Sequence, residues 1–138
     1  MAQVSEVMTA DPRTVTTDDA LTDAAKIMRD EGVGAVIVTE NQEVWGIVTD
    51  RDIAIRGIAE GKDPAQTAVD EVSSRDLTVL SPDQETGEAV RLMTERNIRR
   101  LPVVEDGKPV GIVSLGDLAQ KLDPESALAD ISAAPPNE

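Results

Sequence analysis

The fold is decided by the stretch Gly46-Ile47-Val48-Thr49-Asp50-Arg51-Asp52, which recurs as Gly111-Ile112-Val113-Ser114-Leu115-Gly116-Asp117. Each stretch predicts a buried apolar strand that runs into a helix, with a hydroxyl residue at the junction and an aspartate three residues later. A hydroxyl is favoured there because its oxygen accepts from backbone N–H groups that lack a partner inside the helix. The same N–H groups and the helix dipole attract anions. We therefore expect the function at these two junctions.

The two stretches belong to a duplication that spans nearly the whole chain. Met28 and Met93 are 65 residues apart, and the junction aspartates, Asp52 and Asp117, keep the same separation. A register held over such a length indicates a repeated structural unit. Other identical residues at this separation are Val4 and Val69, Glu6 and Glu71, Val7 and Val72, Val38 and Val103, and Ala54 and Ala119.

Apolar periodicity predicts the same elements in both copies. In the first copy we expect a lead-in turn, a short extended piece, a helix ended by Gly32, two strands joined at Asn41-Gln42, and a second helix. We expect the lead-in turn at Val4 to Met8, the extended piece at Thr14-Val15, and the first helix with Leu21, Ala24, Ala25 and Met28 on one face. The two strands are expected at Ala35 to Thr39 and Val44 to Val48, and the second helix at Asp50 to Glu60. In the second copy, they are a helix at Thr86 to Arg96, strands at Arg100 to Glu105 and up to Val113, and a helix at Leu115 to Leu122.

The fold class is therefore α/β (α+β), with two β-α-β-β-α repeats. One repeat alone cannot cover its sheet, so we expect the two to pack face to face with pseudo-two-fold symmetry. The expected boundaries are 1–62 for the first repeat, 63–124 for the second and 125–138 for a short C-terminal tail. Clefts between such repeats are places where small ligands bind.

Composition narrows the classes of function. The 138 residues carry a net charge of −14, which argues against nucleic acid or an anionic membrane as a partner. With one Trp and no Phe or Tyr, the core must be aliphatic. The absence of Cys and His removes disulfides, zinc–thiolate sites and histidine acid–base chemistry, and we expect neither catalytic nor metal-binding residues. No apolar run reaches membrane-spanning length, so the expected compartment is the cytoplasm.

These residues resemble the CBS-domain family in its tandem form, the Bateman module. The resemblance covers Val4 to about Leu122 and includes Val7-Met8-Thr9, the run from Ile98 to Val104, and the two G-h-x-[ST]-x-x-D stretches, where h is apolar. The stretch from Asp50 to Pro64 also looks like the actinobacterial members of the hypoxic response protein type.

The resemblance implies a regulatory module that binds adenosine-containing ligands between its repeats. Expected ligands are AMP, ADP or ATP, with Mg²⁺ possible beside a polyphosphate, or else NAD(H) or S-adenosylmethionine; no cofactor is required. It implies that Asp52 and Asp117 hold the ribose hydroxyls and that Thr49 and Ser114 lie near the phosphate. It also implies a homodimer formed through helices, and a regulated protein, of unknown identity, on a separate chain. Residues implied near the base are Val33, Ile98, Thr9 and Arg13.

Each candidate residue also has a purely structural interpretation. Thr49 with Asp52, and Ser114 with Asp117, have the spacing of a capping box, in which the acid returns a hydrogen bond to the N–H of the capping residue. Arg99 and Arg100 suit phosphate capture, but a pair of solvated arginines is the alternative.

The first copy has Gly34 and Ala35 in place of those arginines, whereas its Arg51 stands where the second copy has Gly116 and is equally suited to a phosphate or to solvent. Trp45 is expected in the core or at a dimer contact, and Asp18, Asp19 and Asp23 at a helix start.

Three functions remain open from the sequence. The first is a ligand sensor, the second is an interaction or scaffold dimer without a physiological nucleotide, and the third is an enzyme. The first is favoured. For one of the two clefts the second is favoured, because the first copy has Gly34 and Ala35 where the second copy has its two arginines. The third is disfavoured because no base, nucleophile or metal cluster accompanies the aspartates.

Overall fold

The computed structural model describes residues 2–75 and 77–122, apart from the side chains of residues 121 and 122. The tail expected at 125–138 lies outside this range. The described residues form a mixed α/β fold, as predicted, with two three-stranded sheets. None of the helices in the described ranges is long and apolar enough to cross a membrane.

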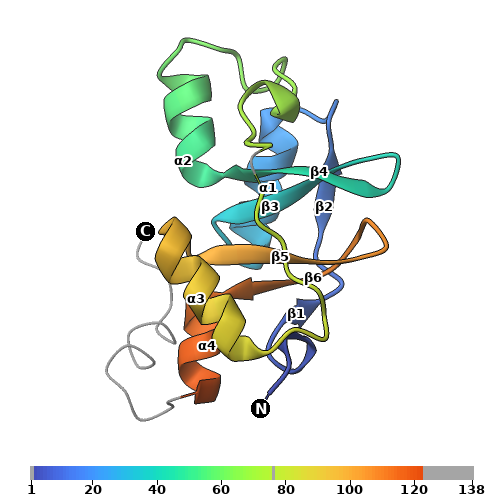
Figure 1. Cartoon of the computed structure of the whole chain (residues 1–138). Helices are drawn as coiled ribbons and strands as arrows, with labels where there is room; N and C mark the ends of the chain where they lie inside the picture. Colours follow the sequence, from blue (N-terminus) through green and yellow to red (C-terminus); the bar gives the residue numbers. More distant parts are fainter. Residues whose placement is uncertain (1, 76, 123–138) are drawn as a thin grey trace. The chain divides into compact units, whose positions relative to one another are not determined.

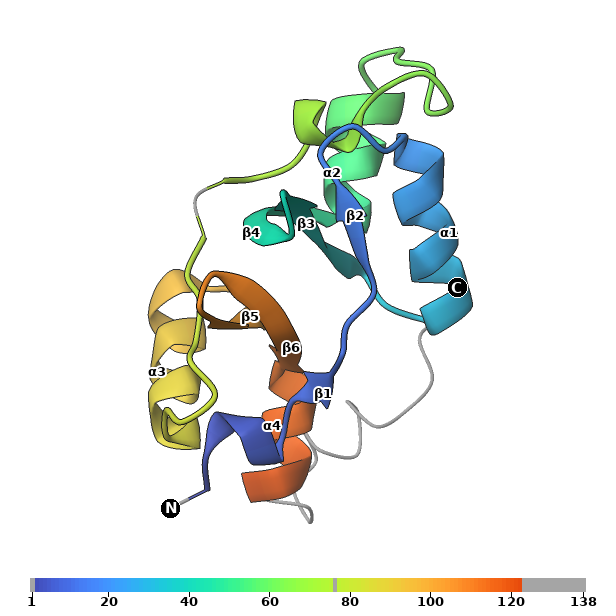
Figure 2. The same cartoon turned by 90° about the vertical axis from the view of Figure 1, so that its right-hand side faces the viewer.

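The polypeptide folds into two compact units that do not follow the sequence repeats (Figures 1 and 2). Unit 1 combines the N-terminal segment up to Pro12 with the chain from Thr78 onward, and unit 2 runs from Arg13 to Leu77. The repeats 1–62 and 63–124 remain a description of the duplication, but packing divides the chain elsewhere.

Unit 2 is built on a sheet in the order β2-β3-β4, with β3 in the centre. Strand β3 is parallel to β2 and antiparallel to β4, and its first five residues are all buried, as the β-branched sequence predicts. The elements are β2 (Thr14–Thr16), α1 (Leu21–Glu31), β3 (Ala35–Glu40), β4 (Glu43–Thr49), α2 (Asp50–Asp52), η2 (Ile53–Ile58) and η3 (Val69–Glu71).

The helices of unit 2 lie at the expected positions with two differences, of which the first is that Ala25 of α1 is exposed and Ile27 is buried in its place. Helix α1 ends at Gly32, whose φ of 66° is the left-handed conformation typical of a helix C-cap. After α2, the second helix continues as the π-helix η2, in which Ala59 N donates to Ala54 O at 2.8 Å. The sequence predicted one uninterrupted α-helix here, because apolar spacing does not distinguish an i→i+5 turn from an i→i+4 turn.

Unit 1 contains a sheet in the order β1-β6-β5, with β6 in the centre. Helices α3 and α4 contact each other and lie beside this sheet (Figure 1). The elements are η1 (Val4–Glu6), β1 (Thr9–Ala10), α3 (Thr86–Arg96), β5 (Arg100–Glu105), β6 (Lys108–Ser114) and α4 (Leu115–Leu122). The bounds of α3, β5 and α4 are those predicted from the sequence.

The lead-in segments of the two repeats are exchanged between the units. Val4, from the start of repeat one, is fully buried in the unit 1 core beside Leu101 and Leu118. Val69, its counterpart in repeat two, is fully buried in the unit 2 core. Each repeat therefore completes the hydrophobic core of the other.

The exchange explains the glycine that opens each junction stretch. Strand β1 pairs with β6 at Thr9 and Ile112, and the equivalent segment of unit 2 pairs with β4 at Ser74 and Ile47. A Cβ atom on Gly46 would lie 2.6 Å from the carbonyl oxygen of Ser74, and one on Gly111 would collide with the side chain of Met8. Both glycines thus let a lead-in segment run close against the neighbouring strand.

We expect the two lead-ins to stabilise different units. Val4→Ala should destabilise unit 1, and Val69→Ala unit 2, by about 2 kcal/mol each, because either change leaves a cavity in a closed core. Hydrogen exchange followed by mass spectrometry should show faster exchange in β5 and β6 for Val4→Ala, and in β3 and β4 for Val69→Ala. The reverse pattern, with each change acting within its own sequence repeat, would contradict the exchange.

Candidate functional site

Both strand-to-helix junctions form the capping box that their spacing predicts. Thr49 N donates to Asp52 Oδ2 and Asp52 N donates to Thr49 Oγ1, each at 3.0 Å. Ser114 and Asp117 make the same pair of bonds, also at 3.0 Å. Each box uses Oδ2 of its aspartate, so the helix cap occupies one carboxylate oxygen and leaves Oδ1 for another partner.

The helix-start amides are less available to an anion than the sequence suggested. Leu115 N donates to Arg99 O at 2.7 Å, and its counterpart Asp50 N donates to Gly34 O at 2.9 Å. Arg51 N is bound as well, by the Oδ1 atom of Asp50 at 2.8 Å. With Asp52 N already capped, the first three amides of the unit 2 helix are all satisfied by the protein.

Arg100 lies directly opposite Ser114 in the β5–β6 register, so the two side chains lie on the same face of the sheet. Arg99 precedes β5 and is held at the start of α4 through its carbonyl oxygen. Both side chains are exposed, and neither has a carboxylate within 4.0 Å in the described part of the chain. The nearby Arg91, in contrast, pairs with Glu88 and Glu95.

In unit 2, strand β3 has no arginine at the position equivalent to Arg100 of β5. Ala35 lies opposite Thr49, as Arg100 lies opposite Ser114. The predicted correspondence of Gly34-Ala35 with Arg99-Arg100 is therefore seen in the strand pairing.

The sequence-predicted residues divide between the two units. The structure brings Ser114, Asp117, Arg99 and Arg100 together at the start of α4, and Thr49, Arg51 and Asp52 at the start of α2. Ile98 packs on the unit 1 core, whereas Val33 is exposed. Thr9 belongs to unit 1 and Arg13 to unit 2, and both are exposed.

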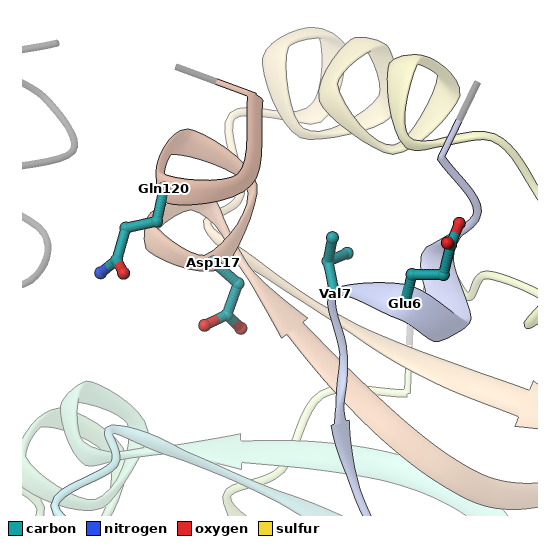
Figure 3. Close-up of a pocket in the computed structure, with 4 residues that line it drawn as sticks. All are labelled: Glu6, Val7, Asp117 and Gln120. Carbon is teal, nitrogen blue, oxygen red and sulfur yellow. The ribbon is translucent and has the colours of Figure 1, made fainter. Parts of the chain in front are cut away.

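An open hollow of about 270 Å³ lies beside Asp117 in unit 1. Asp117 and Gln120 line it from α4, and Glu6 and Val7 line it from the N-terminal lead-in (Figure 3). The side chain of Asp117 points into this space. Glu6, like Asp117, has one carboxylate oxygen held by the backbone, because its Oε2 accepts from Gln3 N at 2.6 Å.

Sequence reasoning missed Glu6, Val7 and Gln120. A signal for the first two was present, since Glu6-Val7 recurs as Glu71-Val72 at the repeat separation. That signal did not reveal the function because the lead-in of repeat one was expected to serve its own repeat. Gln120 carried no signal, because its counterpart is Ile55.

The remaining candidates have structural roles. Trp45 packs against the unit 2 core, and the Arg75 guanidinium lies 4.5 Å from the centre of its ring. Asp23 caps α1 by accepting from Ala20 N at 3.1 Å. The Thr16 hydroxyl donates to Asp18 and lowers the pKa of that carboxyl group. Across residues 2–75 and 77–122, no three acidic side chains gather in a way that would hold a metal ion.

Comparison with curated proteins gives close relatives over nearly the full length. The chain is 42% identical over 128 residues to the CBS domain-containing protein YhcV of Bacillus subtilis, covering 92% of this chain and 91% of that protein. It is 33% identical over 135 residues to Hypoxic response protein 1 of Mycobacterium tuberculosis, covering 97% and 94%.

Solved structures share the fold. The crystal structure of Hypoxic Response Protein I with two coordinated zinc ions superposes with a TM-score of 0.80 at 31% identity, covering 86% of this chain and 98% of that one. The CBS domain pair of protein MJ0100, in complex with 5′-methylthioadenosine and S-adenosyl-L-methionine, gives 0.81 at 23% identity, covering 91% and 99%, and this likeness shows the fold alone.

The family model for the CBS domain matches residues 4–56 and again 69–124. The two matches contain the two strand-to-helix junctions and both lead-ins. The resemblance stated from the sequence is thereby confirmed: this chain belongs to the CBS-domain family and carries two CBS domains in tandem.

Proposed function

We propose that the chain is a non-catalytic sensor module that binds an adenosine-containing ligand beside Asp117. The observation that carries this proposal is the hollow next to Asp117, a carboxylate already fixed by the helix cap. One oxygen of Asp117 is held by Ser114 N, and the other is suited to accept from a ribose hydroxyl. Holding the carboxylate before the ligand arrives lowers the ordering cost of binding.

The ligand class comes from the family resemblance and from the chemistry of the site. The proposed ligands are AMP, ADP, ATP, NAD(H) or S-adenosylmethionine, and MJ0100 was crystallised with two adenosyl compounds. A 5′ phosphate would lie toward Ser114 and Arg100, which share one face at the start of α4. Thr49, Arg51 and Asp52 are the corresponding candidates in unit 2, and Val33, Ile98, Thr9 and Arg13 remain proposed contacts of the base.

Thermal unfolding against a ligand panel tests this proposal. We expect at least one of 5′-methylthioadenosine, S-adenosylmethionine, AMP, ATP with Mg²⁺ and NAD to raise the Tm as its concentration rises. A ligand at a hundred times its Kd stabilises the fold by about 2.7 kcal/mol. Asp117→Asn should remove most of the shift, because the amide can still cap Ser114 N but loses the second acceptor.

Asp23→Asn is the matched control, since it makes the same charge change at another helix-capping acid and should keep the shift. If no ligand raises the Tm of the wild-type protein, the sensor function is wrong. The alternative, an interaction or scaffold protein without a nucleotide, would then stand.

The two arginines supply a separate test of the phosphate end. Arg99→Ala and Arg100→Ala should each weaken AMP binding about tenfold, because a charge-assisted contact to phosphate is lost. Binding of 5′-methylthioadenosine, which has no phosphate, should change little. Isothermal titration calorimetry measures both, with Arg96→Ala as the control for lost surface charge. Equal AMP affinity in all three variants would contradict the assignment.

We further propose that the module forms a homodimer through the second helix of unit 2. Ile55 and Ile58 lie three residues apart on η2 and are 44% and 53% exposed, an apolar pair in a strongly acidic protein. A second copy packed on this part of the helix would bury the pair.

The double change Ile55→Ser and Ile58→Ser should convert the dimer to a monomer in size-exclusion chromatography with light scattering. Val79→Ser, at another exposed apolar residue, should leave the dimer intact. A wild-type monomer at every concentration tested, or a dimer that survives the double change, would contradict this interface.

A further inference from the structure

The space beside the junction aspartate is filled differently in the two units. In unit 2, Arg56 lies one turn after Asp52 on the same helix, and its Nε is 4.0 Å from Asp52 Oδ1. The Nη1 atom of Arg56 also donates to Val72 O at 3.3 Å. The guanidinium group therefore spans from the helix to the lead-in segment.

The same positions border the open hollow in unit 1. At the 65-residue separation, Asp52 and Val72 correspond to Asp117 and Val7, which both line the hollow. At the position of Arg56, the sequence of the second repeat has Lys121. In unit 2, Arg56 thus connects the aspartate with the lead-in carbonyl, whereas the equivalent residues of unit 1, Asp117 and Val7, line the hollow.

Two further features of the unit 2 junction place charged side chains of the protein itself around the helix start. Lys62 Nζ lies 3.6 Å from Glu71 Oε1, whereas the counterpart of Glu71 in unit 1, Glu6, is one of the residues that line the hollow. Asp50 places its own carboxylate at the helix start, bonded to Arg51 N at 2.8 Å, where unit 1 has the apolar Leu115. An anionic ligand would meet that carboxylate at the end of the helix that the dipole makes favourable to anions.

We propose that each chain takes a single ligand, at the unit 1 junction, and that Arg56 closes the matching position in unit 2. This inference rests on the proposed function and adds which copy binds and what blocks the other. Arg56 is a specificity-determining residue here, because its charge lies 4.0 Å from Asp52 Oδ1 and it donates to Val72 O, so it occupies both groups that a ligand would otherwise contact. Its side chain is 57% exposed, against 17% for Asp52, so the bridge lies at the surface and its removal leaves the core intact.

Binding stoichiometry tests the inference directly. Native mass spectrometry and calorimetry with AMP and with 5′-methylthioadenosine should give one bound molecule per wild-type chain. Arg56→Ala should give a second, weaker binding event, and Asp117→Asn should remove the single wild-type event. Arg29→Ala is the matched control, because Arg29 is another exposed, ion-paired arginine of unit 2, and it should keep one molecule per chain.

The outcomes separate this inference from the proposed function. Two molecules per wild-type chain would overturn the single-site inference while the sensor function stood. One molecule per chain in Arg56→Ala as well as in wild type would overturn the blocking role of Arg56. A wild-type protein that binds neither probe, together with a flat thermal response to the whole panel, would instead remove the proposed function itself.

Discussion

The structure depends on the burial of two equivalent valines in cores that belong to the other repeat. Val4 and Val69 are both fully buried, and each lies in the lead-in of one repeat and the core of the other. A lead-in of this kind has too few apolar residues to fold alone, so its ordering must be offset by burial against a neighbour. Because the exchange is reciprocal, neither repeat has a complete core without the other. The duplication is therefore a requirement of the fold, and not simply two domains in sequence.

The same exchange builds the candidate site. The lead-in that buries Val4 in unit 1 also carries Glu6 and Val7 to the hollow beside Asp117 (Figure 3). A change in the hollow can thereby alter how firmly the N-terminal segment is held, and vice versa, since binding and docking involve the same few residues. In a sensor such a link is useful, because a ligand changes an equilibrium only through different affinities for its two states.

Local features of the sequence predicted local structure well. Helices α3 and α4 and strand β5 have the bounds that periodicity and capping residues indicate, and Gly32 ends α1 as its left-handed φ requires. The capping boxes at Thr49 and Ser114 follow from a spacing of three residues.

What escaped prediction is long-range. The separation between equivalent residues is the same whether a lead-in packs on its own repeat or on the other one. It therefore could not reveal the exchange or the position of Glu6. The π-helix after Asp52 escaped for a local reason, since its register differs from an α-helix by one residue per bond.

The capping box and the ligand site were posed as alternatives by the sequence, but the geometry makes them compatible. A carboxylate has two oxygens, and the cap uses only Oδ2 at both junctions. The two copies differ in what lies next to the aspartate on the side away from the cap. In unit 2 it is the guanidinium group of Arg56, near Asp52, and in unit 1 it is the open hollow beside Asp117. Both copies have the cap, which stabilises the helix start in each unit. No such constraint applies to the outer face of the aspartate, so the copies can differ there, as they also differ between Asp50-Arg51 and Leu115-Gly116.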